Sequence, residues 1–420
     1  VVILVTSHMV CCLIKMAENY LDSIELPDEG DNIIRTRDLN VVPNPAGFGY
    51  ELFTHLKKHG DKVAQIDAET GITENFNQYF RRILRVALHL KERGVKPGDV
   101  VAPCTSNHLD TGVVFVAPLL IGAQVACFDP NALYADTKFL MDLIRPKVMF
   151  ASEEAVDNLE KVKAELNMDV EIVVFGPTKE HTPFEEYLKP FPKEQEDNFE
   201  PYRVNDLFET AIIALTSGSY LKPFPKEQED NFEPYRVNDL FETAIIALTS
   251  GSTGTPKGLC MSHFVILSQF GRRKSQGYSI AAIYSPIVWI SGQLSIIMQI
   301  IFGNPRLICD KFTPENSWRY LTKYKANSLT LSSQDAMLLL KYGNPERLES
   351  PYLLLVVVTG GKMSVENMSA LSKIFLNRVL VVCPYGQSEI YGVAFSFDMG
   401  LFAKNPATAG KPIKGFWYKV

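Results

Sequence analysis

The chain has neither a paired-cysteine pattern nor a hydrophobic segment long enough to span a membrane. Its seven cysteines are odd in number and include no C-x-x-C pair, which argues against a disulfide framework and against a zinc knuckle. The apolar stretch Val1–Ile14 is too short to cross a bilayer, and it lacks the basic start and the small-residue cleavage site of a signal peptide. We therefore expect a protein of a reducing compartment with no integral membrane segment.

An excess of positive charge is also lacking. Asp and Glu number 48 against 42 Lys and Arg, which gives a formal net charge of -6. This balance gives no electrostatic reason to expect nucleic acid as a partner. A hydrophobic content of 46% and a charged content of 21% are ordinary for a soluble globular protein. The 420 residues suffice for two or three compact units with a sizeable core.

We expect the first residues to lie outside the native protein. The chain begins with Val1, whereas Met16 opens a plausible translation start. We interpret residues 1–15 as a non-native leader, upstream sequence translated in error, with a signal anchor as the alternative.

Beyond Pro45 the hydrophobic pattern predicts an α/β domain. Short apolar strands alternate with segments of helical spacing, which implies parallel pairing with crossover helices. One predicted helix stops at Gly94, because glycine is favoured just past a helix end. The predicted strands are Asp99–Ala102, Val148–Phe150 and Glu171–Phe175; the predicted helices are the segment with Tyr79, Ile83, Val86 and Leu90, Val113–Ile121, and the segment with Ala155, Leu159, Val162 and Leu166.

The chain contains a perfect internal repeat. Residues 187–219 are identical to residues 220–252 at all 33 positions. Solenoid repeats diverge and number three or more, so we interpret the first copy as an insertion from assembly, exon duplication or recent duplication. The second copy is continuous with Lys257, so we expect it to occupy the native strand and the first copy to loop out or displace it. A long structureless insertion in a compact domain is itself unusual.

A loop rich in glycine and hydroxyl side chains begins at the end of the second copy and continues beyond it, so the repeat ends partway through this loop. Residues 248–258 have the sequence L-T-S-G-S-T-G-T-P-K-G. Glycine lets backbone N–H groups approach phosphate oxygens, hydroxyls add donors, and Lys257 supplies a positive charge. The segment does not fit G-x-x-x-x-G-K-[ST], because Pro256 precedes Lys257 and Gly258 follows it. This argues against a Walker-type ATPase; a flexible Ser/Gly hairpin tip is the alternative to a phosphate site.

At every fixed position this loop resembles T-S-G-[ST]-T-G-x-P-K-G, the signature of the adenylate-forming (AMP-binding) enzyme superfamily. Its members include acyl-CoA synthetases, 4-coumarate-CoA ligases and insect luciferases. Gly94–Val101 and Ser106–Asn107 are moderately similar to the first subdomain of that family. The resemblance implies a carboxylate–CoA ligase that uses ATP, Mg²⁺ and coenzyme A with a small-molecule fatty or aryl acid. It also implies a peroxisomal location, or otherwise the cytoplasm.

The resemblance assigns the phosphate contacts to this loop. Hydroxyls and backbone N–H groups would bind the ATP phosphates, and Lys257 would steer the pyrophosphate leaving group, a catalytic role. The residues assigned in this way are Thr249, Ser250, Gly251, Ser252, Thr253, Gly254 and Lys257.

A second candidate follows the apolar run Leu353–Val358, which is typical of a strand buried on both faces. It leads through two glycines into a helix that Ser364 can cap. Ligands bind beyond the carboxyl ends of strands in open α/β sheets, although Gly-Gly turns are common. In its place after the signature loop, the turn resembles the family's adenosine-binding turn, which assigns Gly360, Gly361 and Lys362 to the nucleotide.

A third candidate follows the predicted strand Val379–Cys383. The sequence P-Y-G-Q-S-E from residue 384 resembles the family's Y-G-x-T-E motif, with Ser in place of Thr. By resemblance Tyr385, with Gly386 beside it, would stack on adenine, and Ser388 would bind phosphate or the adenylate. Glu389 would hold Mg²⁺, which prefers carboxylate oxygen. A Tyr-Gly turn with a solvated Glu is the alternative.

The acyl side departs from the family. Residues 285–292 align with P-x-F-H-x-x-G, and the usual histidine is here Trp289. A bulky apolar ring cannot donate to the acyl carboxylate as imidazole does. This substrate-gate position puts substrate choice and the rate of either half-reaction in doubt, but not nucleotide binding.

Three histidines are expected to be unrelated to the chemistry. His55 and His59 share one helical face, but Leu56 stands where a zincin needs Glu, so we expect a solvated face rather than a metal site. His263 is interpreted as structural.

The last residues resemble the start of a further subdomain. Ala407–Pro412 is similar to the segment that opens the family's β-barrel subdomain, and the sequence stops at Val420. The family's ribose-binding Asp, its hinge and its C-terminal domain with the adenylation lysine follow later, as would a C-terminal peroxisomal tripeptide. We therefore expect this chain to be inactive or nearly so. The alternatives to a ligase are a luciferase-like monooxygenase and a non-catalytic nucleotide-binding paralogue.

The sequence thus predicts an α/β large domain with two doubly wound subdomains and the start of a β-barrel. The predicted divisions are the leader 1–15, a first α/β subdomain 16–186, the duplicate 187–219, a second α/β subdomain 220–390 with the nucleotide site, and the barrel start 391–420.

Overall fold

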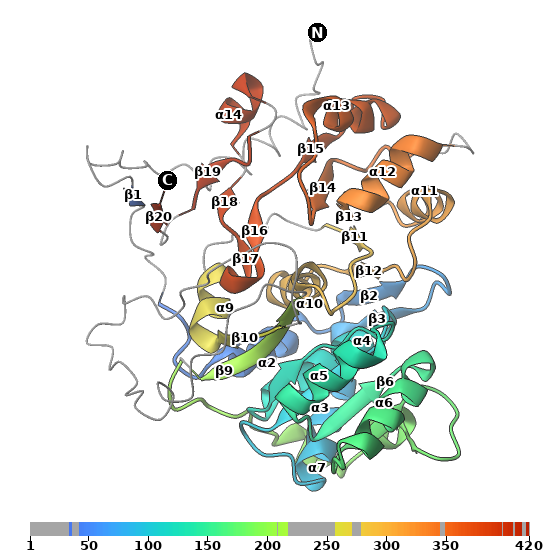
Figure 1. Cartoon of the computed structure of the whole chain (residues 1–420), viewed down its shortest axis with the longest axis vertical. Coiled ribbons are helices and arrows are strands. Elements are labelled where there is room, and N and C mark those ends of the chain that lie inside the picture. Colours follow the sequence, from blue (N-terminus) through green and yellow to red (C-terminus); the bar gives the residue numbers. More distant parts are fainter. Residues whose placement is uncertain are drawn as a thin grey trace.

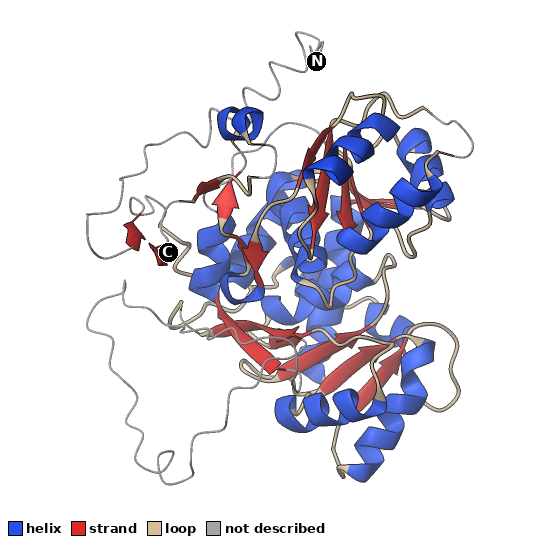
Figure 2. Cartoon of the chain, turned by 45° about the horizontal axis from the view of Figure 1, so that its top comes forward, coloured by secondary structure: helices blue, strands red, loops and turns tan. Residues whose placement is uncertain are grey.

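The structure, a computed structural model, describes residues 33–35, 42–207, 209–216, 257–270, 279–344, 349–396, 398–405, 408–413 and 417–419. The leader 1–15 lies outside these residues. Two seven-stranded sheets organise the described chain, one in the lower half and one in the upper half of Figure 1, and Figure 2 shows helices packed around both. Most neighbouring strands pair in parallel, so the predicted α/β fold class is confirmed.

The first sheet has the strand order β10-β9-β5-β4-β6-β7-β8. Its strands are parallel except where β10 pairs with β9. The strands are β4 (Val100–Cys104), β5 (Gln124–Ala126), β6 (Val148–Ala151), β7 (Glu171–Val174), β8 (Thr182–Pro183), β9 (Thr210–Thr216) and β10 (Lys257–Ser262). The three strands predicted in this region are confirmed as β4, β6 and β7.

The second sheet has the order β15-β14-β13-β11-β12-β2-β3, in which only β3 is antiparallel. Because β2 and β3 come from residues 63–75, the two sheets interleave along the chain. The strands are β2 (Val63–Asp67), β3 (Thr73–Asn75), β11 (Ala281–Ile283), β12 (Arg306–Ile308), β13 (Ser328–Ser332), β14 (Leu355–Thr359) and β15 (Leu380–Val382).

Several helices begin and end at the residues that their sequences favour. Asn75 and Gln78 form a capping box at the start of α3, and Gly94 follows its end at φ 79°. Ser364 caps α13 as predicted, accepting from the Asn367 backbone N–H. The helices are α2 (Phe48–His59), α3 (Phe76–Glu92), α4 (Thr111–Leu120), α5 (Tyr134–Ile144), α6 (Glu153–Glu165), α7 (Lys193–Asp197), α9 (His263–Phe270), α10 (Ile290–Phe302), α11 (Pro314–Lys323), α12 (Ser333–Tyr342), α13 (Val365–Ile374) and α14 (Met399–Lys404), with 3₁₀ turns η1 (Phe184–Leu188) and η2 (Ser388–Ile390).

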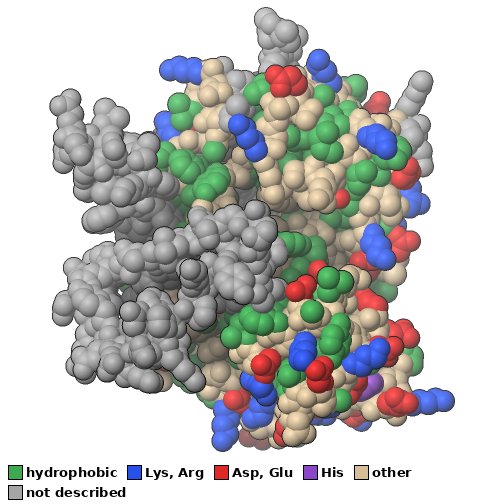
Figure 3. All heavy atoms as spheres, in the orientation of Figure 1, with side chains coloured by type: hydrophobic (Ala, Val, Ile, Leu, Met, Phe, Trp, Pro, Cys, Tyr) green, Lys and Arg blue, Asp and Glu red, His purple; other side chains and the backbone are tan. Residues whose placement is uncertain are grey.

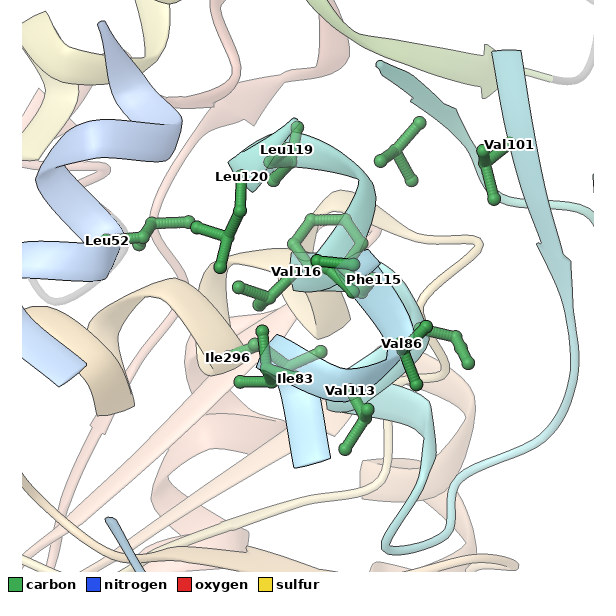
Figure 4. Close-up of a cluster of buried hydrophobic side chains, with 14 of the residues drawn as sticks. Leu52, Ile83, Val86, Val101, Val113, Phe115, Val116, Leu119, Leu120 and Ile296 are labelled. Carbon is green, nitrogen blue, oxygen red and sulfur yellow. The ribbon is translucent and has the colours of Figure 1, made fainter. Parts of the chain in front are cut away.

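Helix α4 lies at the centre of the largest core cluster. All ten of its residues are buried, as expected for a helix that is apolar on every side. Figure 4 shows side chains of α4 surrounded by Leu52 of α2, Ile83 of α3 and Ile296 of α10. The buried helix predicted at Val113–Ile121 is therefore confirmed.

The two sheets differ in how their faces are covered. In β6, Phe150 points to the α3–α4 side and Met149 to the α5–α6 side, and both are buried. In β14, Val356 is buried against the α11–α13 side, whereas Val357 is only half-buried. The prediction that this apolar run is buried on both faces is wrong, because α12 and its neighbours cover only one face of the strand.

Strand β9 is formed by the first copy of the repeat. It pairs antiparallel with β10, Thr216 opposite Lys257, and in parallel with β5. The first copy is also fastened by the Tyr187 hydroxyl, which donates to Glu171 at 3.0 Å. The expectation that the second copy occupies this strand is wrong. The first copy begins within η1 and runs on through α7 to β9, whereas residues 220–252 lie outside the described residues.

The remaining described strands form three two-stranded antiparallel sheets near the carboxyl-terminal part. The pairs are β16 (Gly386–Gln387) with β17 (Gly392–Val393), β18 (Phe395–Ser396) with β19 (Lys411–Pro412), and β1 (Ile33–Arg35) with β20 (Trp417–Lys419). Within the described ranges, no helix combines the length and the apolar character needed to cross a membrane.

Candidate functional site

Three of the predicted segments lie at one edge of the second sheet. Strands β11, β13, β14 and β15 are parallel neighbours, so their carboxyl ends meet at the same edge. The Gly360–Lys362 turn follows β14, the hairpin that begins at Tyr385 follows β15, and the loop to Trp289 follows β11. This edge is where open α/β sheets bind ligands.

The turn after β14 has free space beside Gly360 and lies against neighbouring residues at Gly361. Gly360 has φ 80°, a left-handed conformation that favours glycine. A Cβ on Gly361 would lie 2.8 Å from the Ser333 Oγ at the start of α12. The Cys383 thiol donates to the Gly361 carbonyl oxygen at 3.2 Å, so the turn after β14 contacts the turn after β15. Lys362 is exposed beside them.

The hairpin β16–β17 carries the Tyr385 motif. Gly386 pairs with Val393, and a Cβ on Gly386 would lie 2.5 Å from the Gly392 carbonyl oxygen, so the strands approach too closely for a side chain there. The Tyr385 side chain is 47% exposed, and its ring lies edge-on to Phe395 at 5.8 Å between centroids. An exposed aromatic ring on a fixed hairpin can stack on a planar ligand.

Ser388 and Glu389 lie in the 3₁₀ turn η2 that joins the two strands. Ser388 is half-buried, and its carbonyl oxygen accepts from the Tyr391 backbone N–H at 3.0 Å. Glu389 occupies the next position of the same turn. Among the described side chains, no three His, Cys, Asp or Glu residues gather as a metal site.

Trp289 stands at the start of α10 with its ring in solvent. The side chain is 53% exposed. Its backbone is fixed, because its N–H donates to Pro286 at 3.1 Å and its carbonyl oxygen accepts from Gly292 at 2.9 Å. A Cβ on Gly292 would lie 2.2 Å from the Pro286 carbonyl oxygen, so this tight turn requires glycine. The start of α10, and with it Trp289, is therefore held at this edge.

Asn107 ties the two sheets together beside this edge. Its side-chain amide lies after β4 of the first sheet and donates to the carbonyl oxygens of Tyr284 at 3.1 Å, Ser285 at 3.3 Å and Cys309 at 3.1 Å. Tyr284 and Ser285 follow β11, and Cys309 follows β12; both strands belong to the second sheet. In the sequence, the similarity of Ser106–Asn107 to the first subdomain of the adenylate-forming family pointed to this position but assigned no role to it.

The remaining predicted phosphate residues are not placed by the structure. Residues 249–254 lie outside the described residues, and only the backbone of Lys257, the first residue of β10, is described. Lys257 therefore lies on the first sheet, whereas the turn follows β14 of the second sheet and the hairpin, which follows β15, forms a separate two-stranded sheet.

Two histidines have clear structural partners. The Nδ1 of His263 accepts from the Phe48 backbone N–H at 3.0 Å, and burial lowers its pKa to about 4, so it is neutral and holds the start of α2. Its structural interpretation is confirmed. His59 is buried, and its Nε2 bonds to the Ile300 carbonyl oxygen at 2.7 Å. The prediction of a solvated face is wrong for His59, because that face of α2 packs against α10.

A surface hollow of about 560 Å³ lies elsewhere, over α6, β7 and β8 of the first sheet. It is lined mainly by charged side chains such as Asp157, Glu160 and Lys163, unlike the largely apolar pockets that bind small molecules. Figure 3 shows acidic and basic side chains interspersed on the described surface of this part of the molecule. We assign it no role.

Comparison with known proteins decides the family. Residues 52–420 match the family described as AMP-binding enzyme. The chain belongs to that family. The AMP-binding enzyme family thus covers both sheets and all three segments at the candidate edge.

Relatives of this AMP-binding enzyme include ligases and luciferases. A probable CoA ligase of Humulus lupulus is 26% identical over 85% of this chain and 60% of its own length. A peroxisomal OPC-8:0-CoA ligase of Arabidopsis thaliana is 23% identical, over 88% and 62% respectively. A luciferin 4-monooxygenase of Luciola mingrelica is 22% identical, over 91% and 68%. The chain thus spans about three fifths of the length of the two ligases.

Solved structures agree with the fold. A luciferase-like enzyme from the nonluminescent mealworm Zophobas morio superposes with a TM-score of 0.76 at 25% identity, covering 91% of this chain and 82% of the other. A long-chain-fatty-acid-CoA ligase from Archaeoglobus fulgidus gives 0.73 at 15% identity, covering 93% and 72%. The second likeness, at so low an identity, shows the fold alone.

Proposed function

We propose that this AMP-binding enzyme is an ATP-dependent carboxylate–CoA ligase. The observation that carries the proposal is the meeting of the Gly360–Lys362 turn and the Tyr385–Ser388 hairpin at one carboxyl edge of a parallel sheet. The CoA ligases among its relatives support it. The substrate would be a fatty or aryl carboxylic acid, and nucleic acid would not be a partner.

The turn and the hairpin would bind the nucleotide. The exposed Tyr385 ring would stack on adenine, and the glycines Gly360, Gly361 and Gly386 would let adenosine approach the backbone. Lys362 would lie beside the nucleotide, and the Ser388 hydroxyl would bond to phosphate or to the adenylate. The loop of Thr249, Ser250, Gly251, Ser252, Thr253, Gly254 and Lys257 would bind the phosphates.

The reaction would proceed in two steps, an adenylyl transfer to the carboxylate followed by an acyl transfer to coenzyme A. A carboxylate oxygen attacks the α-phosphorus of ATP and pyrophosphate leaves; the sulfur of coenzyme A then attacks the acyl carbon and AMP leaves. Lys257 would compensate the charge on the leaving pyrophosphate. Glu389 would hold Mg²⁺, which supplies further charge neutralisation when bound.

Trp289 would set the acyl specificity. Its half-exposed ring at the start of α10 offers apolar contact where the family has a hydrogen-bonding histidine. This change favours an aromatic or aliphatic acid held by contact with the indole ring. It also supports the alternative of a non-catalytic nucleotide-binding paralogue. The luciferin 4-monooxygenases among the relatives support a luciferase-like monooxygenase as the other alternative. A peroxisomal location is proposed by likeness to the Arabidopsis ligase.

A pair of glycine substitutions tests the nucleotide site. Gly360 follows β14 at φ 80° and Gly176 follows β7 of the first sheet at φ 91°, and a Cβ at either position would meet open space. Gly360→Ala and Gly176→Ala should therefore carry a similar backbone strain of about 1 kcal/mol. Only Gly360→Ala should weaken AMP and ATP binding in calorimetric titration, about fivefold or more.

Activity assays, together with the binding titrations, separate the alternatives. ATP–pyrophosphate exchange dependent on a carboxylic acid, followed by acyl-CoA formation, would support the ligase. ATP binding without exchange, in a chain extended to the length of its ligase relatives, would favour the non-catalytic paralogue, and light emission with luciferin would favour the monooxygenase. The proposal fails if the chain binds neither AMP nor ATP, or if both alanine variants weaken binding equally.

A further inference from the structure

Two buried glutamines form hydrogen bonds with the hairpin that carries Tyr385 and Ser388. Gln269 of α9 donates from Nε2 to the Ile390 carbonyl oxygen at 2.8 Å. Gln293 of α10 is fully buried, and its Oε1 accepts from the Tyr391 hydroxyl at 2.8 Å. Its Nε2 donates to the Ile287 carbonyl oxygen at 2.8 Å. One side chain thus joins the hairpin to the loop that ends at Trp289.

Both the side chain and the backbone of Tyr391 are held by their surroundings. It follows η2 directly, and its side chain is fully buried in the same core cluster as α4. Its φ of 51° lies in the left-handed region, which a bulky non-glycine residue rarely adopts. Such a conformation persists only where surrounding contacts hold it. Burial raises the pKa of its hydroxyl well above the ordinary value, so the group stays protonated and donates to Gln293.

We propose that Tyr391 is a positioning residue that couples the nucleotide side of the candidate site to its acyl side. Through Gln293 it holds the Tyr385–Ser388 hairpin at a fixed distance from the Trp289 loop. Tyr391 itself touches neither ligand. This inference rests on the proposed function of that edge, because it assigns the nucleotide to the hairpin and the acid to the Trp289 loop.

The coupling has an observable consequence. A nucleotide that binds the hairpin should change the surroundings of the Trp289 ring through the Tyr391–Gln293 hydrogen bond. Trp289 fluorescence reports this directly, because its ring is half-exposed. Trp318 is buried in the second core with its Nε1 bonded to the Gly343 carbonyl oxygen at 2.9 Å. A Trp289→Phe variant gives the background emission of Trp318 and Trp417.

The central test compares Tyr391→Phe with Tyr79→Phe in the full chain. Both tyrosines are fully buried, but the Tyr79 hydroxyl has no hydrogen-bond partner among the described residues. With AMP as the probe, the wild type and Tyr79→Phe should show the same Trp289 emission shift. In Tyr391→Phe the shift should fall by at least half, and the AMP dissociation constant should rise about threefold to tenfold, because a buried acceptor loses its donor.

A double variant separates positioning from simple stability. Tyr391→Phe with Gln293→Met removes donor and acceptor together, so no Oε1 acceptor remains without its donor. The Ile287 carbonyl oxygen loses its Nε2 donor as well, so thermal stability should recover only in part relative to Tyr391→Phe. If Tyr391 positions the site, the emission shift stays small in the double variant. If the shift returns with stability, or is unchanged in Tyr391→Phe, the inference is overturned. Failure of the wild type to bind AMP would instead overturn the proposed function.

Discussion

The two sheets have the same number of strands, but their surroundings differ. In the first sheet, every residue of β6 is buried, because helices α3 and α4 cover one face and α5 and α6 the other. In the second sheet, β13 and β14 alternate between buried and half-buried residues, with α11–α13 on the buried face. The described part of the candidate site follows strands that helices cover on one face only, such as β14. The enclosed strand β6 supplies stability, whereas β13 and β14 lead to polar groups within reach of a ligand.

Alanine substitutions at adjacent residues test this comparison most strongly. Phe150→Ala and Met149→Ala in β6 should each lower the free energy of unfolding by about 3–5 kcal/mol, because each removes a buried side chain from a different core. In β14, Val356→Ala should cost about 2 kcal/mol and Val357→Ala less than about 1 kcal/mol. Urea unfolding measures all four. Equal losses at Val356 and Val357 would show that the second sheet is enclosed on both faces.

A pH dependence tests how the first sheet is held to α2. His263 follows β10, and burial lowers its pKa to about 4 from the ordinary 6.5. Because the folded pKa lies below the unfolded one, its contribution is fully present above pH 6.5 and is lost as pH falls toward 4. The loss should be on the order of 3 kcal/mol. His263→Gln should make the unfolding profile less steep in this window, and His108, whose pKa burial also lowers to about 4, should keep the remaining slope. An unchanged slope in His263→Gln would assign the acid loss to other groups.

Removing one copy of the repeat tests the edge of the first sheet. Residues 217–256 now separate Thr216 from its partner Lys257. In a chain with a single copy, Thr249 would take the place of Thr216, and only residues 250–256 would lie between the paired strands. The shorter loop lowers the entropic cost of closing the pair by about 1.5 kcal/mol. We expect the AMP dissociation constant to fall, by at most about tenfold.

Because the copies are identical, deleting residues 187–219 or residues 220–252 gives the same shortened chain. Unchanged or weaker AMP binding in the shortened chain would show that the spacing between β9 and β10 does not limit the site.

Features that depend on neighbouring residues could be predicted from the sequence. The all-apolar run of α4 and the Ser364 cap of α13 each involve residues within one or two helical turns, and both are confirmed. The meeting of the Gly360 turn and the Tyr385 hairpin could be inferred because parallel neighbours end at one edge. Their roles in binding remain predictions.

Features that depend on distant partners could not be predicted. Nothing in the sequence distinguishes the two copies of the repeat, so the choice of the first copy for β9 rests on chain continuity alone. His59 was expected in solvent, because its partner Ile300 lies on a helix far along the chain. The pairing of Tyr391 with Gln293 has no local pattern either, since a buried glutamine and a buried tyrosine resemble ordinary polar residues until the fold brings them together.

The side-chain amide of Asn107 has a mechanical consequence. Its hydrogen bonds fasten the end of β4 to the segments after β11 and β12, so a rotation of one sheet against the other would break all three bonds together. The contact at Asn107 can therefore open only when all three hydrogen bonds break, and a small displacement of one sheet is passed on to the other. We expect the two sheets to move as one rigid body when a ligand binds, with any large displacement confined to segments that are not part of either sheet.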